Sequence, residues 1–226
     1  MQGVFVTGTD TGCGKTRVAG LLIRSLRKRG VQVAGFKPVA AGAVRRDGIL
    51  QNDDALALAE ASGLDLPYTL INPYCFAAPV SPHLAAADVG ATIDLRRIRE
   101  ATNRLAAAAD FLVVEGAGGW RVPLGPDLDM QDLARELGFP VVLVVGLRLG
   151  CLNHALLTAQ VIRDSGLPLT GWIGNRIDPD MSHVDENVMT LKQRLGAPCL
   201  GVLPFVADGV ELAPQALPDV APLLIR

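Results

Sequence analysis

Three short segments of this chain are apolar at nearly every position, and they restrict the possible folds most strongly. They are the runs FLVV from Phe111, VVLVV from Val141 and LTGWI from Leu169. Successive side chains of a strand point to opposite faces of a sheet, so a strand without alternation is buried on both faces. Such strands are typical of a parallel sheet that helices cover, and they argue against an antiparallel sheet with one wet face.

Amphipathic stretches separate these apolar segments along the chain. We expect helices over Thr16–Lys28, Asp53–Ala61, Leu95–Ala108, Met130–Leu137, Asn153–Asp164 and Val184–Leu195. We expect strands over Gly3–Val6, Val31–Phe36, Phe111–Val114, Val141–Val145, Leu169–Ile173 and Leu200–Leu203. The alternation predicts an α/β fold with a mostly parallel sheet flanked by helices on both faces. Because no linker interrupts the pattern, we expect one domain over residues 1–226, with the Pro214–Pro222 segment winding over its surface.

Composition excludes several classes of protein. Half of the 226 residues are hydrophobic, so the chain can bury a core, and disorder is not expected. A net charge of −2 argues against a general nucleic-acid binder. The four cysteines form no C-x-x-C pair and the three histidines offer no zinc spacing, so we expect reduced thiols. Neither a signal peptide nor a bilayer-spanning run of about 20 apolar residues is present, so we expect a soluble, cytoplasmic protein with no membrane partner.

The segment Gly8–Thr16, with sequence GTDTGCGKT, is the strongest functional motif. It lies between a predicted strand and a predicted helix, which is the context of a phosphate loop and makes the fold P-loop NTPase-like. Glycines let backbone N–H groups turn toward phosphate oxygens, Lys15 would reach the β- and γ-phosphates, and the Thr16 hydroxyl would bind Mg²⁺. The spacing departs from G-x4-G-K-[ST] because Gly8 lies one residue early and Thr9 occupies the position of the first glycine.

Charged residues at other strand and helix ends complete a site for nucleotide chemistry. Glu115 follows an apolar strand and could hold Mg²⁺ where ligands bind in parallel sheets, or it could cap the glycine turn behind it. Asp53 and Asp54 begin a predicted helix, where each could be an N-cap or one could bind the metal. Lys37 ends a strand before Pro38, so its charge would point into the same crevice and stabilise a transferring phosphoryl group.

Six blocks of sequence, in this order, resemble dethiobiotin synthetases over about residues 3 to 212. The blocks are Thr7–Thr11, Gly14–Thr16, Lys37–Val39, Val114–Gly119, Leu149–His154 and Ala159–Ile162. The resemblance implies a cyclo-ligase that makes dethiobiotin from 7,8-diaminopelargonic acid, CO2 and ATP, with Mg²⁺, in biotin synthesis. In that family a substrate amine takes up CO2 as a carbamate, ATP phosphorylates the carbamate, and the second amine closes the ureido ring.

The resemblance also implies roles for individual residues. The implied catalytic residues are Lys37, Lys15 and Thr11, of which Thr11 would contact the diamine. The implied ATP-binding residues are Gly12, Cys13, Gly14, Lys15, Thr16, Arg17, Asp54, Glu115, Gly116, Ala117, Gly118, Asn175, Arg176, Pro204, Phe205, Val206 and Glu211, with Asn175 at the adenine edge. Thr16, Asp54 and Glu115 are the implied Mg²⁺ ligands.

The diamine itself would be bound by Ala41, Gly150, Cys151 and Asn153. In the resembling enzymes the helix start at residues 150–153 comes from the partner subunit and binds the substrate carboxylate, which implies a homodimer. Without the resemblance, Asn153 reads as an ordinary helix N-cap. Ala41 departs from the family, which commonly has Ser or Thr there, so one hydrogen bond to the substrate is lost or passes to water.

Two other functions fit parts of the pattern. ATP-gated partner-switch proteins of the partitioning or septum-site type share the deviant phosphate loop, but they carry an additional lysine where this chain has Asp10. They also often have a basic amphipathic surface, whereas the end of this chain is broken by prolines. A glutamine-dependent amidotransferase of the cobyric-acid type would need a glutaminase domain, for which 226 residues leave no room.

Overall fold

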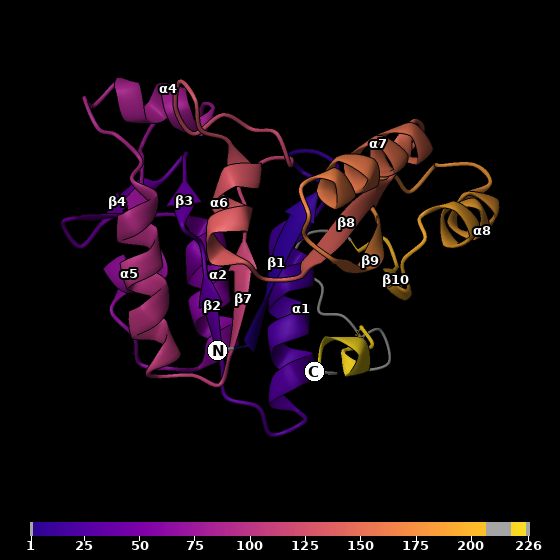
Figure 1. The fold of residues 1–226 in the computed structure, drawn as a ribbon, viewed down its shortest axis with the longest axis horizontal. Coiled ribbons are helices and arrows are strands. Elements are labelled where there is room, and N and C mark those ends of the chain that lie inside the picture. Colours follow the sequence, from indigo (N-terminus) through magenta and orange to yellow (C-terminus); the bar gives the residue numbers. More distant parts are fainter. Residues whose placement is uncertain (1, 207–217, 225–226) are drawn as a thin grey trace.

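A parallel sheet lies at the centre of the molecule and confirms the predicted fold class (Figure 1). In this computed structural model, which describes residues 2–206 and 218–224, the central sheet has six strands in the order β10-β9-β8-β1-β7-β2, and every neighbouring pair is parallel. Its strands are β1 (Gln2–Gly8), β2 (Val33–Phe36), β7 (Phe111–Glu115), β8 (Val141–Leu147), β9 (Leu169–Arg176) and β10 (Cys199–Leu203).

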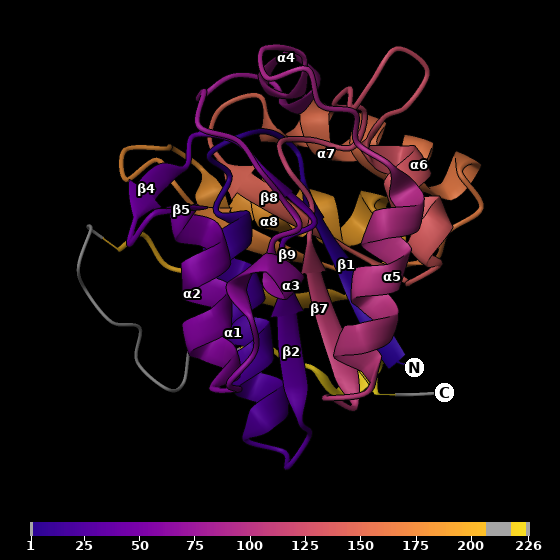
Figure 2. The same ribbon diagram turned by 90° about the vertical axis from the view of Figure 1, so that its left-hand side faces the viewer.

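Helices cover both faces of this sheet, as predicted. The helices of four residues or more are α1 (Lys15–Arg27), α2 (Asp53–Ser62), α3 (Tyr68–Ile71), α4 (Pro82–Ala87), α5 (Leu95–Ala106), α6 (Met130–Leu137), α7 (Cys151–Asp164) and α8 (Val184–Arg194). Figure 2 shows α1 and α2 on one side of β2 and β7, with α5 and α6 on the other. The alternation of side chains along β1 separates two cores, because Val4 and Val6 pack with α1 whereas Phe5 packs with the cluster that contains α5 and α6.

Short elements between β2 and α5 were not predicted from the sequence. They are α3 and α4, the parallel pair β3 (Val39–Ala40) and β6 (Tyr74–Cys75), and the hairpin β4 (Val44–Arg46) with β5 (Ile49–Gln51). Strands of two or three residues are too short to show a periodic pattern. The boundaries of the predicted elements shift by up to three residues, and β2 begins at Val33 instead of Val31.

Two helix starts differ from the sequence-based assignment. The N-cap of α2 is Asn52, whose side-chain oxygen accepts hydrogen bonds from the N–H groups of Asp54 and Ala55. The aspartates therefore do not cap the helix. Helix α7 begins at Cys151 after Gly150, which has a left-handed φ of 94°, so the interpretation of Asn153 as the N-cap was wrong.

The carboxyl ends of β1, β2 and β7 meet at one edge of the sheet. Strand β1 pairs with β7, which pairs with β2, so Glu115 and the residue after Phe36 end side by side near the loop that follows Gly8. In the described part of the chain, none of the helices is both long and apolar enough to cross a membrane. Glu211 and the first four residues of the Pro214–Pro222 segment lie outside the described residues.

Candidate active site

The loop between β1 and α1 adopts a conformation that depends on two glycines. Gly12 and Gly14 have φ values of 74° and 92°, in the left-handed region where side chains are strained. Gly14 is also the N-cap of α1, so the first N–H groups of the helix face the loop. A Cβ at Gly14 would lie 2.1 Å from Nδ2 of Asn175, which donates a hydrogen bond to the carbonyl of Cys13. The loop therefore has the geometry of an anion-binding site, and Asn175 of β9 holds it in this conformation.

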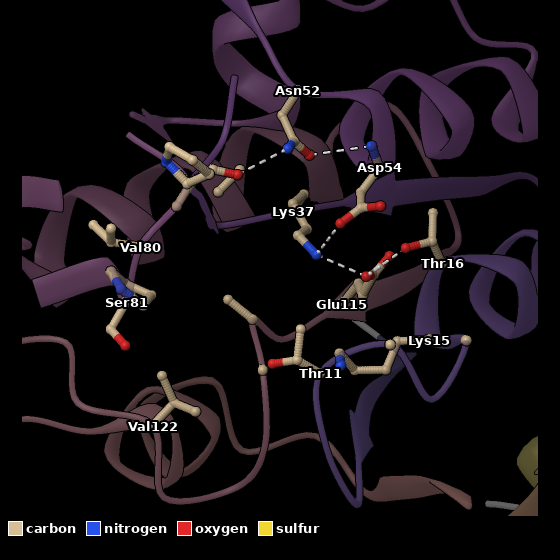
Figure 3. Close-up of a pocket in the computed structure, with 18 residues that line it drawn as sticks. Thr11, Lys15, Thr16, Lys37, Asn52, Asp54, Val80, Ser81, Glu115 and Val122 are labelled. Atoms are coloured by element: carbon tan, nitrogen blue, oxygen red, sulfur yellow. Dashed lines mark hydrogen bonds and ion pairs between the residues drawn. The ribbon is translucent and has the colours of Figure 1, made fainter. Parts of the chain in front are cut away.

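Lys37 lies between two carboxylates at the floor of the site (Figure 3). Its Nζ donates to Oδ2 of Asp54 at 2.9 Å and to Oε1 of Glu115 at 2.7 Å. The Thr16 hydroxyl donates to the same Glu115 oxygen at 2.9 Å. The side chains of Lys37 and Glu115 are 4% and 1% exposed, whereas that of Asp54 is 42% exposed. Four residues that were predicted from separate motifs thus form one hydrogen-bonded cluster.

The charges in this cluster shift the pKa values of its members in opposite directions. Burial acts to lower the pKa of Lys37, but the negative charges of Glu115 and Asp54 outweigh it and raise the pKa above its ordinary value. Burial acts to raise the pKa of Asp54, but the charge of Lys37 and hydrogen bonds from Lys37 and Thr16 lower it. Both groups therefore stay charged over a wide range of pH.

The residues predicted to hold Mg²⁺ have a donor set that suits this ion. Glu115 Oε2 is buried, and it has no hydrogen-bond partner among the described residues. An orphaned carboxylate oxygen beside the Thr16 hydroxyl and the half-exposed Asp54 is an acceptor that a hard cation can satisfy. No group of three or more His, Cys, Asp or Glu side chains is placed to hold a metal in the described residues, so a cation here would depend on the Thr16 hydroxyl and these two carboxylates.

Lys15 and Asp10 are linked on the other side of the loop. Lys15 is buried, and its Nζ donates to the main-chain oxygen of Asp10 at 2.9 Å. The Asp10 carboxylate accepts a hydrogen bond from the Thr11 N–H and pairs with Arg148 at 2.5 Å. The position where partner-switch proteins carry a lysine is thus occupied by an acidic residue that is itself neutralised.

A cavity of about 640 Å³ opens beside this cluster. The predicted residues in its lining are Thr11, Gly12, Gly14, Lys15, Thr16, Lys37, Ala41, Asp54, Glu115, Ala117 and Gly118. The lining residues missed at the sequence level are Ala40, Asn52, Pro79, Val80, Ser81, Pro82 and Val122. Ser81 precedes a proline, and Asn52 precedes two aspartates. Both patterns indicate a helix start, so they are signals that could have found these two residues. Nothing in the sequence places Val80 or Val122 opposite Lys37 (Figure 3).

Several predicted nucleotide residues lie outside this cavity, next to α1. Asn175 is buried, and its side-chain oxygen accepts a hydrogen bond from Arg17 at 2.7 Å. Arg17 also donates to the carbonyl of Pro204 at 3.1 Å, so it joins the end of β9 to the segment after β10. The bonds to Arg17 and to the Cys13 carbonyl leave the Asn175 amide with one N–H and one acceptor lone pair. Phe205 is exposed, Cys13 and Gly116 are buried, and Arg176 and Val206 are half-buried.

The start of α7 is not part of the lining of this cavity. Gly150 and Asn153 are exposed, Cys151 is buried, and Leu149 is 94% exposed. The exposed helix start and the apolar side chain before it face away from the core. The structure therefore does not bring residues 150–153 into contact with the other substrate residues that were predicted.

Comparisons with known proteins identify the family of this chain. A family profile described as an AAA domain matches residues 2–211. The ATP-dependent dethiobiotin synthetase BioD of Aromatoleum aromaticum is 54% identical over 203 residues, which cover 90% of this chain and 90% of the relative. The enzyme of the same name from Pseudomonas paraeruginosa is 49% identical over 224 residues, which cover 99% of this chain and 98% of the relative.

Solved structures share the fold at low sequence identity. The MinC:MinD cell division complex of Aquifex aeolicus matches with a TM-score of 0.54 at 16% identity, covering 90% of this chain and 81% of that one. The signal recognition particle 54 kDa protein of Aeropyrum pernix, bound to GDP, matches with a TM-score of 0.52 at 20% identity. That match covers 89% of this chain but 41% of the other, so this chain spans less than half of its length. These likenesses establish the P-loop NTPase-like fold alone.

Proposed function

This chain belongs to the ATP-dependent dethiobiotin synthetases, and on that premise we propose how its own residues perform the reaction. It is an ATP-dependent ligase of biotin biosynthesis. The proposed substrates are 7,8-diaminopelargonic acid, CO2 and ATP, and the proposed products are dethiobiotin, ADP and phosphate. The convergence of Lys15, Thr16, Lys37, Asp54 and Glu115 on one cavity is the observation that carries the proposal.

The loop and the two lysines would position the reacting groups and neutralise their charge. N–H groups of residues 12–17 would hold the phosphates of ATP, with Lys15 turning from the Asp10 carbonyl toward the γ-phosphate. An oxygen of the carbamate attacks the γ-phosphorus, ADP leaves, and a mixed carbamic–phosphoric anhydride forms. Lys37, already protonated and buried, would donate hydrogen bonds to the oxygens on which negative charge accumulates. Little covalent work falls to the protein, so most of the rate enhancement would come from positioning.

Ring closure then needs the second amine close to the carbamoyl carbon. The amine nitrogen attacks this carbon, the C–O bond to phosphate breaks, and the amine loses a proton. Thr11 and Ala41 border the region where the diamine would lie, and Val80 and Val122 offer an apolar wall for its methylene chain. Ala41 supplies no hydroxyl, so the hydrogen bond that Ser or Thr would give the diamine there is lost or passes to water.

Thr16, Asp54 and Glu115 would hold Mg²⁺, and the ion would supply positive charge that neutralises the phosphate oxygens. The unpaired Glu115 Oε2 supports this assignment.

The carboxylate end of the diamine needs an anchor several methylenes away from the amines. We place it at the N-terminus of α7 of a second subunit, because Gly150 and Asn153 are exposed and do not line the cavity of their own chain. The exposed Leu149 beside them supports a homodimer with a shared site. The single domain and the cytoplasmic location stay predictions.

The deciding experiment is a complete assay of the purified protein. Incubation with the diamine, bicarbonate, Mg²⁺ and ATP should yield dethiobiotin by mass spectrometry, and omission of the diamine should nearly abolish phosphate release. Lys37→Gln should lower turnover by roughly 10²-fold, the scale for loss of one electrostatic stabiliser. A rate of phosphate release that is independent of the diamine but rises strongly with DNA or lipid vesicles would instead favour a partner-switch ATPase.

A further inference from the structure

Lys37 and Asp54 come from different elements, yet their side chains meet at 2.9 Å. Lys37 follows β2, whereas Asp54 lies in the first turn of α2. The two backbones are joined by a chain of hydrogen bonds through Asn72, Tyr68 and Asn52 that neither the sequence motifs nor the proposed mechanism uses.

The first link holds the main chain of Lys37. Nδ2 of Asn72 donates to the carbonyl of Lys37 at 2.7 Å and to the carbonyl of Tyr74 at 3.0 Å. The Asn72 side chain is buried, and both of its N–H groups are used in this way. The carbonyl of Lys37 precedes a proline and lies beyond the last residue of β2, so it depends on Asn72 for a partner.

The second link runs through the hydroxyl of Tyr68 to the start of α2. The hydroxyl donates to Oδ1 of Asn72 at 2.9 Å and accepts from the N–H of Asn52 at 2.7 Å. Asn52 in turn caps α2 and donates from Nδ2 to the carbonyl of Ala41 at 3.2 Å (Figure 3). One phenol oxygen therefore joins the segment that carries Lys37 to the cap of the helix that carries Asp54.

We propose that Tyr68 and Asn72 are positioning residues, which fix Lys37 relative to Asp54 and so set the rate of phosphoryl transfer without contributing to the affinity for ATP in the absence of Mg²⁺. The chain of hydrogen bonds through Asn72, Tyr68 and Asn52 includes no residue of the phosphate loop, whose Cys13 carbonyl is bound instead by Asn175. A displacement of about 1 Å in a reacting group can lower a rate by about 10²-fold. A phosphate loop that has not moved keeps its affinity for the nucleotide. The inference rests on the proposed function, because it assigns Lys37 to the transfer step.

The two tyrosines of the chain provide a matched test. Tyr74 uses its hydroxyl in the same way, since it accepts from the N–H of Asp94 at 2.8 Å, but it serves the cap of α5, a helix that contributes no residue to the cavity lining. Tyr68→Phe and Tyr74→Phe each remove one oxygen that accepts from the main-chain N–H of a cap residue. Tyr68→Phe also removes the donor to the buried Asn72 Oδ1, so it should lower thermal stability at least as much as Tyr74→Phe does.

The expected outcome separates catalysis from stability. Tyr68→Phe should lower kcat by about tenfold or more, while the Kd for ATP, measured by calorimetry without Mg²⁺, changes by less than about threefold. Tyr74→Phe should keep the wild-type kcat once the folded fraction is taken into account. Equal kcat values for the two variants would overturn the inference, and so would a loss of ATP affinity in Tyr68→Phe that matches its loss of kcat.

A second variant keeps the test decisive if Tyr68→Phe does not fold. Asn72→Ser cuts the same chain at its other end, so it should reproduce the loss of kcat, and the double variant should lose little more than either single one. Fully additive losses would mean independent effects and would reject the shared chain. If the wild-type protein makes no dethiobiotin, the proposed function fails; if it does and only the variants behave otherwise, this inference alone fails.

Discussion

Gly14 combines two constraints that other amino acids do not satisfy together. Its φ of 92° strains any L side chain, and a Cβ would meet Nδ2 of Asn175 at 2.1 Å. Gly30 has a similar φ of 81°, but a Cβ there would meet nothing within 4 Å among the described residues. The comparison of these glycines therefore separates backbone strain from the effect of the clash.

We predict that Gly14→Ala weakens ATP binding at least tenfold, whereas Gly30→Ala leaves it unchanged. Both variants should lose about 1–2 kcal/mol of stability from the left-handed backbone. Only Gly14→Ala would also push away Asn175 and, through it, Arg17. Calorimetric titration with ATP and urea unfolding measure the two effects, and equal ATP affinities in both variants would contradict the role of the Gly14–Asn175 contact.

The pair of Lys37 and Asp54 predicts how stability depends on pH. The raised pKa of Lys37 stabilises the fold below the ordinary value of 10.5, and this contribution is lost as pH rises through the raised value. The lowered pKa of Asp54 stabilises the fold above the ordinary value of 3.8, and this contribution is lost as pH falls through the lowered value. The ion pair therefore contributes its full stabilising free energy at neutral pH.

Lys37→Met removes the pair, so its free energy of unfolding should lie below that of the wild type by a constant amount near neutral pH. The difference should shrink below pH 3.8 and above pH 10.5. Urea unfolding at a series of pH values gives both curves. A difference that already disappears between pH values of about 6 and 8 would show that the ion pair does not stabilise the fold.

Helix α7 allows capping and ligand binding to be distinguished at one residue. Asn153 is exposed and lies inside the helix, where alanine is more favourable than asparagine by up to about 0.7 kcal/mol. Asn153→Ala should therefore leave stability unchanged or slightly higher, while raising KM for the diamine if this residue helps to anchor the carboxylate. A lower melting temperature in this variant would indicate that Asn153 caps the helix after all. An unchanged KM would show that Asn153 does not help to bind the diamine.

Elements with complete local signals could be predicted, and those without them could not. Helix α6 was placed correctly at both ends, because Asp129 and Asp132 form a capping box and Gly138 ends it in the left-handed region. The start of α7 was misplaced because a glycine cap leaves no side-chain signature. Lys37 and Glu115 were predicted to meet because parallel strands end at one edge, whereas the Tyr68 contact depends on a four-residue helix that shows no period.

Two defective proteins should complement each other if the site is shared between subunits. A Lys37→Gln subunit keeps its own α7 start, and a subunit with Gly150→Val keeps its own lysines. Mixing and subunit exchange should produce heterodimers with one intact site, so some turnover should return. If mass spectrometry confirms exchange and no activity appears, each subunit must anchor its own substrate.

The central position of β1 affects the order in which the chain can fold during synthesis. β1 is translated before both of its neighbours, because Gln2 pairs with Phe111 and Phe5 pairs with Val141. Until those strands are made, both edges of this apolar strand lack their native partners, which favours aggregation and chaperone binding. The phosphate loop directly after β1 therefore acquires its final shape only after these later strands exist, so a nascent chain cannot consume ATP before then.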